Sequence, residues 1–140
     1  TGEKGARKKT NNQWFETQDT IGYWEDFYKQ KILYSEIVRE PQFYFDKEGK
    51  FFPEATTFLM TGKNLDFLYH VLHTKVITYF FKTFYAGGGL GEEGYRYKKK
   101  FLENLPIPKN FTNTNYDNIE LSICKLYQLT DEEIEFINSQ

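Results

Sequence analysis

The chemistry-bearing residues of this sequence concentrate in one segment, residues 85–108, which reads YAGGGLGEEGYRYKKKFLENLPIP. Glycine has no Cβ, so the cluster of Gly87, Gly88 and Gly89 would let the backbone approach a ligand closely. The run that follows places tyrosine rings beside cations, which can stack on bases and neutralise phosphate. A solvated loop with its tyrosine rings packed inward is the alternative. The segment predicts a nucleic-acid contact loop, with phosphate contacts from Lys82, Arg96, Tyr97, Lys98, Lys99 and Lys100.

Three other patterns could carry chemistry, and each has a simpler interpretation. Residues 89–94 fit G-x-G-x-x-G, but two acids lie inside the pattern and no small-residue helix start follows, so dinucleotide binding is not predicted. Asp46 and Glu48 stand in a D-x-E-x-K string like that of Mg²⁺-dependent nucleases, yet their crowding into one turn favours solvated side chains. His70 and His73 have helical spacing but no third metal ligand within reach in sequence. We therefore expect no catalytic residues and no metal site.

Charge is distributed unevenly along this chain of 140 residues, whose net charge is −2. Residues 61–100 hold seven Lys or Arg against three acids, whereas residues 101–140 hold two against seven. A basic face can steer a polyanion despite a negative total, and two ordinarily solvated surfaces are the alternative. Aromatic residues make up 19% of the chain, and such large rings can build a core from a modest apolar fraction.

The first half of the chain favours a small antiparallel sheet, because β-branched and aromatic runs alternate with turn residues. Gly49 suits the turn of a β-hairpin. In chain order the predicted segments are a flexible arm or linker (1–13), apolar residues at helical spacing (14–28), a strand (31–37), a hairpin of 43–45 and 51–52 around the turn 46–49, and a strand (56–60).

The second half has the period of helices. Asn64 and Thr74 are good N-caps, and Thr130 opens a capping box with Glu133. Cys124 lies in an apolar pattern and is expected to be buried. Helices are predicted over 65–72, 76–84, 98–105 (a short helix or turn), 119–127 and after Thr130. The predicted fold is α+β, one domain over 14–140 with a small antiparallel sheet in its N-terminal half and helices following.

No apolar run reaches 18 residues and the N-terminal segment is polar, so neither a membrane span nor a signal peptide is predicted, and a cytoplasmic location is expected. The chain opens without Met in a basic, glycine-containing segment, which suggests a fragment of a longer chain.

Three segments occur in a familiar order: KILYSEIVREPQFYFDKEGKFFP, TTFLMTGKNLDFLYHVLHTKVITYFFKTFYAGGGLG and YRYKKKFLENLPIP. This order resembles the TaqI-like C-terminal specificity domain, the target-recognition part of N6-adenine DNA methyltransferases and of fused restriction–modification enzymes. The similarity extends over about residues 13–137. It rests on the aromatic entry from Trp14 to Trp24, the helical unit at 61–84 and the Leu-Pro-Ile-Pro exit at 105–108.

The resemblance implies a division of labour. This chain would hold double-stranded DNA while an N-terminal methyltransferase domain of the same parent chain methylates a flipped adenine. S-adenosylmethionine, and Mg²⁺ if an endonuclease is fused, would bind in that parent protein and not in this fragment, where the Asn-Pro-Pro-Tyr motif is absent. Arg39 and Gln42 would be base readers, since Arg pairs with guanine and Gln with adenine.

Two other functions stay open on the sequence. A protein-interaction module would use surface aromatics and the acidic helix after Thr130, and its binding would be insensitive to salt. A free-standing nuclease would use Asp46 and Glu48 and require Mg²⁺. A DNA reader would instead show duplex binding that weakens steeply with salt.

Overall fold

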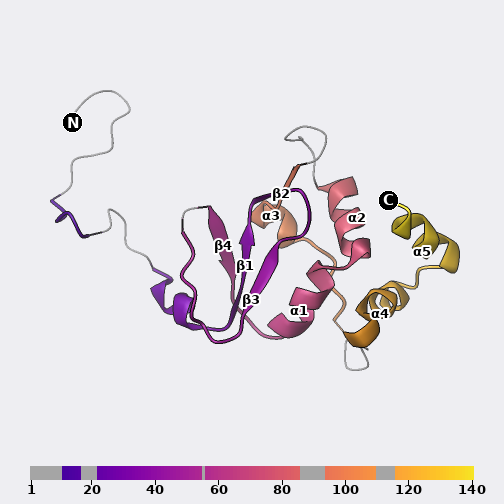
Figure 1. Ribbon diagram of the computed structural model, residues 1–140, viewed down its shortest axis with the longest axis horizontal. Coiled ribbons are helices and arrows are strands. Elements are labelled where there is room, and N and C mark those ends of the chain that lie inside the picture. Colours follow the sequence, from indigo (N-terminus) through magenta and orange to yellow (C-terminus); the bar gives the residue numbers. More distant parts are fainter. Residues whose placement is uncertain (1–10, 17–21, 55, 86–93, 110–115) are drawn as a thin grey trace.

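The computed structural model describes residues 11–16, 22–54, 56–85, 94–109 and 116–140, which form the α+β fold predicted from the sequence (Figure 1). Strands come first, and most of the helices follow. In chain order the elements are η1 (Trp24–Tyr28), β1 (Lys31–Ser35), β2 (Ile37–Val38), β3 (Phe43–Asp46), β4 (Thr57–Met60), α1 (Leu65–Leu72), α2 (Lys75–Phe84), β5 (Tyr95–Arg96), α3 (Lys99–Leu102), η2 (Tyr116–Asn118), α4 (Ile119–Leu126) and α5 (Asp131–Asn138).

The central sheet has three antiparallel strands in the order β3-β1-β4. In the middle strand, Ile32 lies opposite Phe45 on one side and Met60 on the other. The first four residues of β1 are all buried, so both faces of this strand are covered. The strands predicted over 31–37 and 56–60 are confirmed as β1 and β4, although β1 ends at Ser35.

A second, two-stranded ribbon pairs β2 with β5, placing Ile37 opposite Arg96 and Val38 opposite Tyr95. The Tyr97 amide donates to the Glu36 carbonyl at 2.7 Å and extends this pairing by one step. The ribbon joins segments far apart in the chain, and β5 was not predicted from the sequence.

The predicted hairpin is wrong, because β3 pairs with β1 and residues 51–52 lie outside any strand. The Asp46 carboxylate accepts hydrogen bonds from the backbone amides of Lys50 (3.1 Å) and Phe51 (2.9 Å), which turns those amides away from a strand partner. Gly49 has φ of 65°, and a Cβ at this position would collide with the carbonyl group of Tyr28, so this turn requires glycine.

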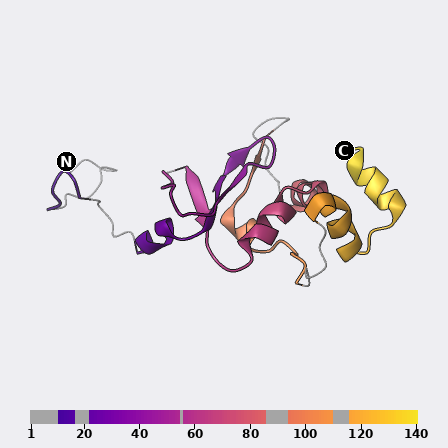
Figure 2. The ribbon, with the colours of Figure 1, turned by 60° about the horizontal axis from the view of Figure 1, so that its bottom comes forward.

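The helices lie beside one end of the sheet (Figures 1 and 2). α1 packs against β1 and β3, α4 against α1 and α2, and α5 against α2. The capping box at Thr130 is confirmed, whereas Asn64 precedes α1 with φ of 57° and makes no side-chain cap. The helical prediction for 14–28 is wrong within the described residues, since only Trp24–Tyr28 forms a helix, of the 3-10 type. No helix in the described part of the chain is long and apolar enough to cross a membrane.

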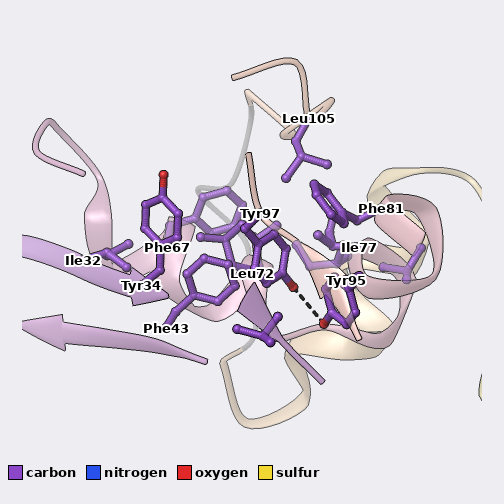
Figure 3. Packing of buried hydrophobic residues seen from close by; sticks show 14 of the residues in the cluster. Ile32, Tyr34, Phe43, Phe67, Leu72, Ile77, Phe81, Tyr95, Tyr97 and Leu105 are labelled. Carbon is purple, nitrogen blue, oxygen red and sulfur yellow. Dashed lines mark hydrogen bonds between the residues drawn. The ribbon is translucent and has the colours of Figure 1, made fainter. Parts of the chain in front are cut away.

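One aromatic-rich core connects the sheet, the ribbon and the helices (Figure 3). Ile32, Val71, Phe81 and Ile123, from four different elements, have no exposed surface. Cys124 is buried beside them, as predicted.

Candidate nucleic-acid interface

The segment around β5 alternates between core and surface. Tyr95 and Tyr97 point inward, while Arg96 between them keeps 41% of its side chain exposed. Such alternation is what a strand produces, because successive side chains point to opposite faces. The aromatic residues thereby fix the ribbon to the core, and the arginine is presented outside.

Tyr97 is only 2% exposed, which corrects its predicted role as a phosphate contact. Its ring centroid lies 4.6 Å from that of Phe81 and 4.9 Å from that of Phe43. The hydroxyl groups of Tyr95 and Tyr97 share a hydrogen bond of 3.2 Å inside the core (Figure 3). Burial raises the pKa of both hydroxyl groups, so they stay protonated at neutral pH. The alternative interpretation of the sequence, in which the tyrosine rings pack inward, is therefore correct for Tyr95 and Tyr97.

The predicted cations remain on the surface around the ribbon. Lys98 directly precedes α3, and Lys99 and Lys100 form its first turn, all three exposed. Lys99 lies 3.6 Å from Glu103, but this pair is solvent-exposed and contributes little stability. The Lys82 ammonium from α2 lies 5.1 Å from the centre of the Tyr95 ring, which places a fifth cation beside β5.

The two predicted base readers lie on the segment between β2 and β3. Arg39 directly follows Val38, in a bend where the ribbon pairing has ended. Gln42 directly precedes β3, and both side chains are exposed. The structure thus places Arg39 just after β2, the strand that pairs with β5. The predicted close-approach residues Gly87, Gly88 and Gly89 lie outside the described residues.

The nuclease-like string does not form a metal site. Asp46 is buried and pairs with Lys31, and the exposed Glu48 pairs with Lys50. His73 uses its Nδ1 to contact the Tyr69 carbonyl at 2.9 Å. Among the described residues, no group of three His, Cys, Asp or Glu is placed to hold a metal ion.

A second surface feature was not located by the sequence. Exposed aromatic rings gather at η1, where the Tyr28 ring contacts both Trp24 and Phe52 edge to face. An open groove of about 930 Å³ runs nearby along β4, with Phe27 and Leu105 among its lining residues. The sequence feature that could have indicated this surface is the density of aromatic residues in 23–28 and 51–52. A sequence pattern alone, however, does not tell which of these residues are buried and which are exposed.

These observations define a small α+β domain that anchors a cationic ribbon on an aromatic core. The family model of the TaqI-like C-terminal specificity domain matches residues 1–107, and the chain belongs to that family. Comparisons with curated proteins and with solved structures found no match. Membership in a specificity-domain family of restriction–modification enzymes gives the chain a role in DNA recognition.

Proposed function

We propose that this chain is the target-recognition domain of a bacterial, cytoplasmic restriction–modification enzyme that methylates adenine in DNA. It holds the duplex while an N-terminal methyltransferase domain of the same parent chain acts on a flipped adenine. The observation that carries this proposal is the exposure of Arg96 on a ribbon whose tyrosine residues pack in the core, followed directly by the exposed Lys98, Lys99 and Lys100 at the start of α3. Family membership supports the same role.

The proposed division of labour leaves catalysis to other parts of the parent protein. S-adenosylmethionine belongs to the methyltransferase domain, and Mg²⁺ to an endonuclease domain where one is fused. The described residues contribute surface cations and polar side chains instead, which position a duplex through its phosphates and read base edges.

The test is a titration of the chain against a randomised DNA duplex at several salt concentrations. We expect binding that weakens with salt, with a slope that reflects the number of phosphates neutralised. Replacing Arg96, Lys98, Lys99 and Lys100 by alanine removes up to four contacts and should flatten that slope by about 0.9 per lost contact.

A matched control removes the same number of positive charges elsewhere, through alanine at Lys29, Lys47, Lys50 and Lys125. These exposed residues lie outside the β5–α3 segment. The control should retain most of the salt slope. Equal slopes for the two variants would show that net charge, and not this segment, determines binding, and would contradict the assignment.

A second candidate function is a protein-interaction module, which the exposed rings of Trp24, Tyr28 and Phe52 favour. This surface lies at the η1 end, away from the β2–β5 ribbon (Figures 1 and 2). It could coexist with DNA binding, as the contact face for another domain. Absence of DNA binding even at low salt, together with salt-insensitive self-association lost in Trp24→Ala, would favour this function over DNA recognition.

A further inference from the structure

The outward face of the β2–β5 ribbon combines one aliphatic side chain with cations. Ile37 and Arg96 are directly opposite in the antiparallel register, so their side chains share one face. Val38 and Tyr95 occupy the other face and pack in the core. The contrast is large, since Ile37 is 54% exposed and Val38 only 4%.

The pairing of the ribbon ends at Val38 and Tyr95. Arg39 follows in a bend outside β2, and its side chain is exposed. Within the paired residues, Ile37 is the exposed apolar position directly across from Arg96. This grouping differs from the aromatic surface at η1, where rings contact other rings.

The ribbon is held in place before any ligand arrives. The amide of Tyr97 bonds to the Glu36 carbonyl at 2.7 Å, and the Ser35 hydroxyl donates to the Ile37 carbonyl at 3.2 Å. The Arg96 guanidinium lies 3.9 Å from the Glu36 carboxylate, which is an ion-pair distance but too long for a hydrogen bond.

Such a ribbon suits the major groove of B-DNA, which is wide enough for two strands. An apolar side chain gains nothing from a phosphate, but it matches the C5-methyl group of thymine, while arginine pairs with the O6 and N7 atoms of guanine. We infer that the outward face of the ribbon is the base-reading element, with Ile37 contacting a thymine methyl group and Arg96 reading a guanine.

This inference rests on the proposed function and deepens it. Arg96 becomes a base reader instead of a phosphate contact, and Ile37 becomes a specificity-determining residue. Lys98, Lys99 and Lys100, which follow the ribbon, keep the phosphate-contacting role.

The experiment selects bound duplexes from a randomised library and sequences them, using the full 140-residue chain and three variants. The variants are Ile37→Ala, Arg96→Lys and, as a control, Leu121→Ala, which shortens another exposed aliphatic side chain on α4. The wild type and the control should select a thymine and a nearby guanine. Ile37→Ala should lose the thymine preference, and Arg96→Lys should reduce the guanine preference about tenfold or more.

Base analogues then test the atoms involved. Replacing the selected thymine by deoxyuridine removes only the methyl group and should weaken wild-type binding about fourfold, with no effect on Ile37→Ala. Replacing the selected guanine by 7-deazaguanine removes the N7 acceptor, and should weaken binding by the wild type but not by a fourth variant, Arg96→Ala. Circular dichroism of each variant establishes that it is folded.

The outcomes separate the two proposals. A wild-type chain that binds no DNA at low salt would contradict the proposed function itself. Sequence-selective binding that is identical in the wild type, Ile37→Ala and Arg96→Lys would overturn the inference and leave the proposed function standing. Binding without any sequence preference would also overturn it, because a ribbon fixed in advance should read bases without its partner domain.

Discussion

At the scale of single residues, an ion pair between Lys31 and Asp46 is buried in the sheet. The ammonium lies 2.5 Å from the carboxylate, and their side chains are 0% and 2% exposed. Lys31 also donates to the Phe27 carbonyl at 2.7 Å, and Asp46 accepts the amides of Lys50 and Phe51. The pair thus joins η1, β1 and the end of β3, so that no polar group of the pair is left without a partner.

We expect acid to weaken the fold through this carboxylate. Burial alone would raise the pKa of Asp46, but its bonds to Lys31, Phe51 and Lys50 lower that pKa to about 2. In the unfolded chain the pKa of Asp46 is near 4, so the lower pKa in the folded state stabilises the fold above about pH 4. This contribution of about 2 kcal/mol is lost as the pH falls toward 2. Urea denaturation between pH 5 and pH 2 should show the decrease.

Two variants make this pH prediction specific. Asp46→Asn cannot titrate, so its already lower stability should change less over the same pH range. Asp66→Asn is the control, because Asp66 makes an exposed ion pair with Lys47 and should keep the wild-type pH dependence. An Asp46→Asn variant with the wild-type pH dependence would contradict the assignment to Asp46.

At the scale of elements, α2 is capped by a side chain from another helix. Glu120 of α4 accepts hydrogen bonds from the amides of Lys75 (2.8 Å) and Val76 (3.1 Å). The residue at the cap position, Thr74, donates its hydroxyl to the Val71 carbonyl at 2.7 Å and does not cap α2. The start of α2 therefore depends on the position of α4.

Replacing Glu120 by alanine should destabilise the domain by about 1 kcal/mol, because two amides and the positive end of the helix dipole lose their partner. Glu120→Gln keeps one oxygen acceptor and should cost less. The free energy of unfolding in urea measures both effects, with exposed Glu135→Ala as the control. Hydrogen exchange at Lys75 and Val76 should accelerate only in the Glu120 variants.

At the scale of the whole molecule, helices beyond the family match complete the core. The match ends at residue 107, yet Ile123 and Cys124 of α4 and Ile137 of α5 belong to the same buried cluster as the sheet and the ribbon. Helices α4 and α5 lie on the side of α2 away from the sheet (Figures 1 and 2). They cover apolar surface that α2 would otherwise expose to water.

Ile123→Ala should therefore destabilise the domain by about 2–5 kcal/mol, since it opens a cavity at a position with no exposed surface. Leu121→Ala, on an exposed position of the same helix, should cost less than about 1 kcal/mol. Circular dichroism during urea denaturation provides the comparison. Equal losses would contradict the view that α4 is part of the core.

How far the sequence predicts this fold depends on how local each signal is. The capping box at Thr130 and the helix after Asn64 depend on neighbouring residues, and their positions are predicted correctly. The pairing of β2 with β5 is not predicted, because it joins segments that are distant in the sequence. Tyr95, Arg96 and Tyr97 have the alternation of a strand, but the adjoining lysines make the segment resemble a loop. The cations of the candidate site are thus predictable from residue type, whereas inward packing of the rings and exposure of Ile37 require the fold.

The pairing of β2 with β5 also constrains how this domain could be re-engineered. Ile37 and Arg96 face each other across the ribbon, but the helices α1 and α2 separate them along the chain. A chimera that exchanges only the segment around Ile37 would set a foreign strand against the native Tyr95 and disturb the register. An exchange of sequence between relatives would therefore preserve the ribbon only when β2 and β5 are transferred together, although they are encoded in two separate parts of the gene.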